Sequence, residues 1–262
     1  MKPSQFGDLD EHAGNRLGCS AAEWRARQEL AACYRVFHLL GWAELVYNHI
    51  SLRVPGSGGQ HFLLNRFGLH YSEIRASNLV KVDLNGRVVA PDDAPVNAAG
   101  VTPHATLHRG VANAHCVMHT HTSSGMAVAS SQGGLSISNF YAAQLGQRLA
   151  YHDFEGITVH TDEAPRLLKS IGDKPAVILR NHGLLAWGPT LPVCFLTLWT
   201  LQRACDVQVA GAALGPAIPI SPEVQRACAA DSLKVSSSDE FGRDVFDAMV
   251  RLVDRSDRSW RD

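Results

Sequence analysis

The stretch Cys116-Val117-Met118-His119-Thr120-His121-Thr122 is an apolar run typical of a buried strand, and two histidines interrupt it. Side chains two residues apart on a strand project from the same face of the sheet. We therefore expect the imidazoles of His119 and His121 to converge on one point. A His-x-His pair alone is equally compatible with a polar strand face, so a third group is needed to indicate a metal site.

A second apolar run, Ala176–Arg180, ends in Asn181-His182-Gly183, where the glycine indicates a turn. Some pairs arise by accident among 13 histidines, but a third imidazole at a strand end favours metal ligands over satisfied core residues. Three imidazoles hold a divalent ion and leave a fourth position open for water or substrate. The predicted ligands are His119, His121 and His182, with zinc favoured and manganese, iron or nickel also compatible.

The composition is that of an ordinary soluble globular protein, with 45% hydrophobic and 19% charged residues among 262. The formal net charge of -1 offers no basic surface, which argues against nucleic acid or a membrane as a partner. No apolar run has the length of a transmembrane helix, and Met1-Lys2-Pro3-Ser4 opens no signal peptide. The six cysteines are scattered without a CxxC spacing, so we expect reduced thiols and a cytoplasmic location.

Helix and strand signals alternate along the chain. Ser20-Ala21-Ala22-Glu23 has the form of a capping box and predicts a helix to about Leu40. Asn85-Gly86 predicts a hairpin, and Thr102-Pro103 predicts the start of a helix that ends near Ala112. Further strands are expected at 49–54, 61–64, 80–84, 87–89, 116–122, 157–159 and 176–180, and further helices from 123, near 141, at 164–171 and at 191–213.

This alternation predicts an α/β fold of three layers, α/β/α, around a central mixed and mostly antiparallel sheet. We expect a loose N-terminal arm at residues 1–19, the main domain at 20–215, and a C-terminal linker and amphipathic helix at 216–262. Proline, serine and alanine mark residues 214–238 as the linker. Residues 239–254 carry apolar side chains at helical spacing and predict the amphipathic helix.

Several longer motifs carry a family resemblance. They are Tyr47–Arg53, Phe67–Ile74 with Ala76–Val82, Tyr151–Gly156 and Ile178–Gly183. On these residues the chain resembles the class II aldolase/adducin family, over a stretch from roughly Gly41 to Gly215. Most of the motifs are closest to the head domain of the adducins. The resemblance implies a class II aldolase-like fold.

In the sugar-phosphate aldolases of this family, two His of an HxH motif, the His of an NHG motif and one Glu hold a zinc ion. The resemblance therefore implies this role for the three predicted ligands, His119, His121 and His182. The Glu does not carry over, because its position falls on Gly100.

The phosphate-binding residues of those aldolases do not carry over either. The paired serines fall on Ala98 and Ala99, and a threonine of the same subsite falls on Phe67. A phosphate dianion needs charge-assisted hydrogen bonds, which carbon side chains do not supply. A sugar phosphate is therefore not the expected substrate.

The resemblance also implies roles around the metal. Asn48 matches a substrate-binding Asn, and the family's acid Tyr falls near Phe140, so the adjacent Tyr141 is the candidate catalytic acid. His104 and His108 are four residues apart on the helix expected beside the metal, and they share one face. Either could replace the missing Glu as a fourth ligand or a proton relay, with His104 the preferred candidate. The alternative is that the pair lies on a solvated helix face.

Two functions follow from the resemblance. The first is a divalent-metal-dependent carbon–carbon lyase, acting by aldol cleavage or decarboxylation on a small carbonyl or hydroxy-carboxylate metabolite. The alternative is a non-catalytic, adducin-head-like oligomeric interaction module. The enzyme is favoured because the chain lacks the long basic tail of the adducins. Under both, a homo-oligomer is expected, typically a tetramer. Asp153 and Glu155 are further acid candidates, although a solvated turn explains them better.

Overall fold

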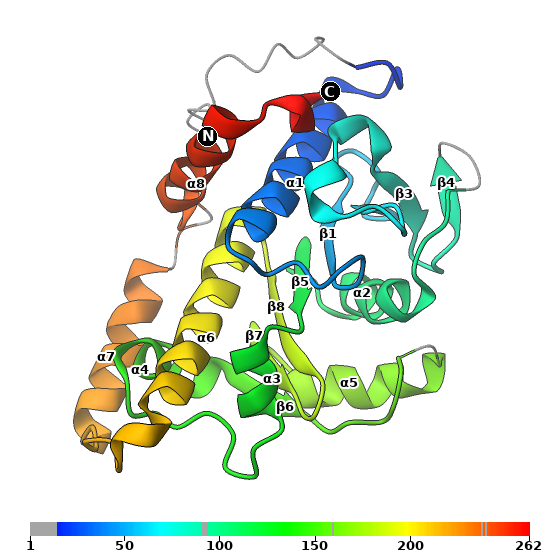
Figure 1. Ribbon diagram of the computed structural model, residues 1–262. Helices are drawn as coiled ribbons and strands as arrows, with labels where there is room; N and C mark the ends of the chain where they lie inside the picture. Colours follow the sequence, from blue (N-terminus) through cyan, green and yellow to red (C-terminus); the bar gives the residue numbers. More distant parts are fainter. Residues whose placement is uncertain (1–14, 91–93, 159, 237, 239) are drawn as a thin grey trace.

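The computed structural model describes residues 15–90, 94–158, 160–236, 238 and 240–262 (Figure 1). The arm expected at residues 1–19 therefore lies almost entirely outside the described residues. Helix α1 (Ala21–Leu39) begins where the sequence predicts, because the Ser20 hydroxyl accepts a hydrogen bond from the Glu23 amide at 3.2 Å.

One eight-stranded sheet runs through the molecule in the order β4-β3-β2-β1-β5-β8-β7-β6. Its neighbours pair antiparallel except for β6 and β7, which are parallel, so the expected mixed, mostly antiparallel sheet is confirmed. The strands are β1 (His49–Arg53), β2 (His61–Leu64), β3 (Val80–Asp83), β4 (Val88–Ala90), β5 (Cys116–Thr120), β6 (Leu149–His152), β7 (Ala176–Leu179) and β8 (Gly183–Gly188).

Helices cover both faces of the sheet, which confirms the three-layer α/β/α fold (Figure 1). One layer consists of α1 with α3 (Ser123–Ala129), α4 (Phe140–Leu145), α6 (Leu191–Gly211) and α8 (Arg243–Ser256). The other consists of α2 (Ala98–Gly110) and α5 (Ala164–Ile171). Among the residues that the structure describes, no helix is both long and apolar enough to span a membrane.

Strand β5 divides its side chains between the two layers. Cys116 and Met118 belong to the large core under α1 and α6, whereas Val117 packs in the smaller core under α2 and α5. Because side chains alternate along a strand, His119 projects toward the α2–α5 side with Val117. The sheet therefore presents its histidines on the face with the thinner helical layer.

Helix α2 starts earlier than predicted. The expected cap at Thr102-Pro103 is wrong, since the helix begins at Ala98 and Asn97 caps it by accepting from the Ala99 amide at 3.1 Å. The Thr102 hydroxyl instead donates to the Ala98 carbonyl within the helix. Proline resembles a helix start in sequence but is tolerated here inside the helix.

Two other expectations are wrong, and two strands, β6 and β8, were not predicted. The strand expected at 157–159 is absent from its described part, where Ile157 is 75% exposed, and Val159 lies outside the described residues. The sheet uses β6 at that end instead. Strand β8 was not predicted, because its short apolar run is bounded by glycines. Most of the linker expected at 214–238 is a helix, α7 (Pro222–Val235), capped by Ser221.

A buried ion-pair network connects α1 to β3 and to the segment just before it. Arg27 is 1% exposed and binds Glu23 at 3.1 Å, and it also donates to the carbonyl groups of Ala76 and Leu79. Lys81 on β3 reaches the same Glu23 at 2.7 Å. The guanidinium therefore neutralises a buried carboxylate and satisfies two buried carbonyls.

We predict that Arg27→Ala destabilises the protein by about 3 kcal/mol, because Glu23 and the two carbonyls lose their buried partner. Urea denaturation at neutral pH measures the change. Lys169→Ala, which removes an exposed charge from α5, serves as the matched control and is expected to change stability by less than about 0.5 kcal/mol. Equal losses in the two variants would show that the network is not stabilising.

Candidate metal centre

The turn between β7 and β8 places His182 against the end of β5. Asn181 has a left-handed backbone (φ 56°), and its amide donates to the Ala129 carbonyl at 3.1 Å. Gly183 approaches β5 so closely that a Cβ there would overlap the Thr120 carbonyl oxygen. The glycine that marked a turn in the sequence is therefore required for close packing of the two segments.

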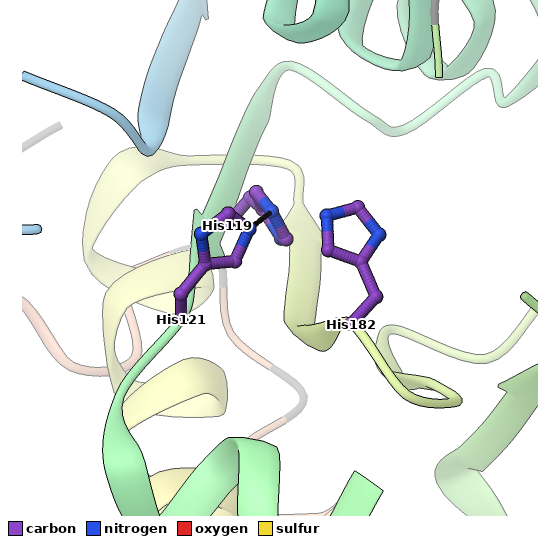
Figure 2. A group of neighbouring side chains, drawn as sticks. All are labelled: His119, His121 and His182. Atoms are coloured by element: carbon purple, nitrogen blue, oxygen red, sulfur yellow. Dashed lines mark hydrogen bonds between the residues drawn. The ribbon is translucent and has the colours of Figure 1, made fainter. Parts of the chain in front are cut away.

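The three predicted ligands meet in the structure, as Figure 2 shows. The Nε2 atoms of His119 and His121 are 2.7 Å apart. The ring of His182 lies with its centroid 4.8 Å from that of His119 and 4.9 Å from that of His121. One ring nitrogen from each residue lies within 4.8 Å of the other two. This arrangement suits a divalent ion with nitrogen ligands.

A backbone contact sets the tautomer of His119. Its Nδ1 lies 2.9 Å from the Leu184 carbonyl oxygen, which can only accept, so Nδ1 carries the proton. The lone pair of Nε2 therefore points toward His121 and His182, as a metal ligand requires. The residues present fit a divalent metal ion.

Burial keeps the three imidazoles uncharged. Desolvation, followed by the neighbouring histidines, holds the pKa of His119 well below its ordinary value. Desolvation also lowers the pKa of His182 to about 4 and lowers the pKa of His121. All three rings are therefore neutral at neutral pH, which is the protonation state that binds metal.

A cavity of about 480 Å³ lies over the triad. This volume suits a small metabolite. Its walls come from the segment before and within β1, the start of α2, and the segment that follows β6. They include Tyr47, His49, Asn97, Ala99, His104, His152, Asp153, Glu155, Glu163 and Arg180.

His104 lines this cavity, but it lies beside His49 rather than within the group of three. The ring centroids of His104 and His49 are 5.7 Å apart. His104 Nδ1 lies 2.6 Å from Ser51 Oγ, which is also 2.7 Å from His108 Nε2. Both α2 histidines are completely buried, so they are not a solvated helix face. A ligand or relay role for His104 stays a prediction.

Asn48 does not line the cavity, although Tyr47 and His49 on either side of it do. Its backbone is left-handed (φ 67°), and its side-chain amide donates to the Trp42 carbonyl at 3.2 Å. The observed contact of Asn48 is therefore with the turn that leads into β1. Its substrate-binding role stays a prediction.

Tyr141 also lies away from the cavity of its own chain. It packs on α4 against Trp199, with ring centroids 5.5 Å apart, and the two line a separate cavity together with Phe241. The structure therefore does not bring Tyr141 to the triad within one chain. Its role as the catalytic acid stays a prediction.

The acidic side chains at the cavity have basic partners. The pairs are Glu155 with Arg166 at 2.5 Å, Glu163 with His152 at 3.1 Å and Asp153 with Arg180 at 3.5 Å. These pairs lie in the segments after β6 and β7. None of the three carboxylates joins the group of possible metal ligands found among the described residues.

His49 is the site residue that the sequence did not reveal. In the antiparallel register of β1 and β5 it stands directly opposite His119. The two rings are nearly parallel, at 13°, with centroids 6.0 Å apart. Desolvation lowers the pKa of His49 to about 3. Cross-strand pairs share a face of the sheet, but only the register identifies them.

Comparison with known proteins gives one consistent result. Residues 28–209 match the family described as the Class II Aldolase and Adducin N-terminal domain. A Pseudomonas aeruginosa protein provisionally named an aldolase class 2 protein is 38% identical over 92% of this chain and 94% of its own. Rat alpha-adducin is 40% identical over 76% of this chain, but the match spans only 27% of the adducin.

A solved structure shows the same fold. The crystal structure of an aldolase II superfamily protein from Pseudomonas syringae superposes with a TM-score of 0.89 at 37% sequence identity. The superposition covers 94% of this chain and 99% of the other. These relatives extend over both the sheet and the helices that enclose the triad.

Buried histidines predict that the metal-free protein loses stability in acid. Desolvation lowers the pKa of His108 to about 3 and that of His104 well below its ordinary value, whereas both titrate near pH 6.5 when unfolded. The unfolded state therefore binds more protons below about pH 6.5, and stability present at pH 7 falls as the pH falls.

We expect His108→Asn to reduce the pH dependence of the unfolding free energy between pH 6 and 4 by up to about 1.4 kcal/mol per pH unit, because one buried imidazole is removed. Urea denaturation in chelator at several pH values measures this slope. His160→Asn, at an exposed position, is the control and is expected to keep the wild-type slope. Identical slopes in all three proteins would contradict the prediction.

Proposed function

The chain belongs to the family of class II aldolase and adducin N-terminal domains, and from this premise we propose that it is a divalent-metal-dependent carbon–carbon lyase. The proposed reaction is aldol cleavage or decarboxylation of a small carbonyl or hydroxy-carboxylate metabolite. The observation that carries this proposal is the convergence of three neutral imidazoles beneath a cavity of about 480 Å³.

His119, His121 and His182 would hold the metal, with zinc as the proposed ion. When bound, the ion supplies Lewis-acid polarisation of a carbonyl or carboxylate oxygen. The protein orients the ligands: the Leu184 carbonyl fixes the ring of His119, and the close packing at Gly183 fixes the position of His182. The cavity walls then position a small substrate over the open side of the site.

A phosphorylated sugar is not the proposed substrate. Ala99 lines the cavity at the start of α2, and the adjacent Ala98 likewise has no hydroxyl to donate. The Ala99 amide is already bound by the Asn97 side chain. This part of the wall therefore offers few donors for the three oxygens of a phosphate group.

We further propose that the protein works as a homo-oligomer, with a tetramer as the expected form. Tyr141 lies away from the cavity of its own chain, so a catalytic role for it requires a second copy that brings α4 to the site. The size of the oligomer in solution tests this requirement directly.

A non-catalytic interaction module is the second candidate. The specific observation in its favour is the 40% identity to rat alpha-adducin over 76% of this chain. The two candidates differ in a simple observable, because only the lyase needs an occupied metal site and turnover.

We predict that His119→Ala removes the metal while the fold survives, because the core on both faces of the sheet does not involve the ion. Elemental analysis of protein purified without chelator is expected to give about one divalent ion per wild-type chain and none in the variant. His152→Ala is the control, since His152 lines the same cavity outside the triad and should keep the ion.

The same proteins then test the function. Wild type is incubated with ketoses, hydroxy-carboxylates and keto acids, and aldehyde and carbon dioxide release are measured. Cleavage that disappears in His119→Ala supports the lyase. Full metal occupancy in His119→Ala would contradict the site assignment, and an empty wild-type site that stays empty with added zinc would favour the interaction module.

A further inference from the structure

The cavity wall beside the triad contains the imidazole of His49, which packs directly against Gly100. Gly100 is buried in the first turn of α2, and a Cβ built on it would overlap the ring of His49. The space into which any side chain at position 100 would extend is therefore filled by His49. His49 in turn is 5% exposed, lines the cavity and stacks on His119.

Hydrogen bonds assign the protonation of His49. Asn97 Oδ1 accepts from the Ala99 amide, so its Nδ2 is the group that faces His49 Nε2, at 3.1 Å. An amide NH₂ can only donate, and Nε2 is therefore an acceptor without a proton. The ring is neutral, and its proton is on Nδ1, which has no hydrogen-bond partner in the described structure.

A chain of hydrogen bonds from His108 through Ser51 also fixes the tautomer of His104. His108 Nδ1 donates to the Ala114 carbonyl at 2.7 Å, so its Nε2 accepts from the Ser51 hydroxyl. That hydroxyl must then accept from His104 Nδ1 at 2.6 Å. His104 therefore has an Nε2 acceptor that, like the Nδ1–H of His49, has no hydrogen-bond partner in the described structure.

The charge balance around the triad follows from these assignments. Three neutral imidazoles leave a divalent ion with its full charge. The nearest wall, formed by His49 and His104, is also neutral. Among the acids that line the cavity, Asp153 is paired with Arg180, Glu155 with Arg166, and Glu163 is hydrogen-bonded to His152. Each carboxylate among the described residues that line the cavity therefore has a partner, and Glu44, which acts electrostatically on His121, lies outside the lining.

We propose that the cavity selects a small carboxylate, and that His49 is a specificity-determining residue, because it fills the wall beside the metal with a neutral ring and leaves no room there for a side-chain carboxylate at position 100. A carboxylate neutralises the ion and accepts hydrogen bonds, whereas a side-chain carboxylate in the same wall would repel it. This inference rests on the proposed metal-dependent function and names the substrate class of that site.

The first measurement is the imidazole tautomers by ¹⁵N nuclear magnetic resonance of the metal-free protein. We expect His49, His104 and His108 all to carry the proton on Nδ1. Ser51→Ala should alter the ¹⁵N shifts of His104, because it removes the acceptor of that proton. A proton on Nε2 of His49 would overturn the assignment on which the proposal depends.

The second measurement is calorimetric binding of lactate and of its neutral amide, lactamide, to the zinc-loaded protein. Wild type is expected to bind lactate at least about tenfold more tightly, since only lactate is charged. Two folded double variants are then compared, His49→Ala/Gly100→Asp and His49→Ala/Gly100→Asn, which have nearly the same shape and differ in charge.

The aspartate variant should bind lactate about tenfold more weakly than the asparagine variant, with lactamide affinity equal in the two. Equal lactate affinities would overturn the inference, and so would a wild type that binds zinc without preferring lactate. Those outcomes leave the metal-dependent lyase intact. A wild type that binds no zinc overturns both. If the double variants do not fold, the wild-type comparison and the tautomers still decide the proposal.

Discussion

The register of β5 against β1 and β8 is the constraint on which the site depends. A slip of one residue would turn Met118 toward the cavity and His119 into the core under α1 and α6, because side chains alternate along a strand. The apolar residues on the core face therefore hold the histidines in place. The same register sets His49 opposite His119 and lets the Leu184 carbonyl fix the ring of His119.

The site is built from neutral imidazoles, which lose their hydration when they are buried. Four buried histidines, His49, His104, His108 and His119, surround the site and carry no charge, and each has at least one ring nitrogen in a hydrogen bond. His49 Nδ1 and His104 Nε2 have no partner, and leaving them buried costs free energy. The proposed divalent ion would introduce a positive charge that the three neutral ligands do not compensate. Family membership alone does not separate a lyase from an interaction module, and binding of an anionic ligand at the proposed metal would favour the lyase.

Much of the fold could be predicted from the sequence, because the decisive signals are local. Ser20 as a cap, Asn85-Gly86 as a hairpin and the spacing of His119 and His121 each involve a few neighbouring residues. The failures have a different cause. Thr102-Pro103 has the form of a helix start, but an earlier cap at Asn97 prevails. His49 and Gly100 belong to one site only because two segments distant in the sequence pack together. A local sequence pattern cannot predict such a contact.

The third ligand lies on a turn, whereas His119 lies within the sheet, and this difference has an evolutionary consequence. His182 depends on a short β7–β8 connection with one left-handed residue and one closely packed glycine. An insertion before Gly183 would displace the imidazole, whereas the pairing of β5 with β1 does not involve this connection. A change confined to this connection would therefore remove the proposed third ligand while the strand that carries His119 keeps its partner β1. A protein with the same sheet can therefore carry the His-x-His pair and still lack the third ligand, so likeness of fold alone does not show that such a metal site is complete.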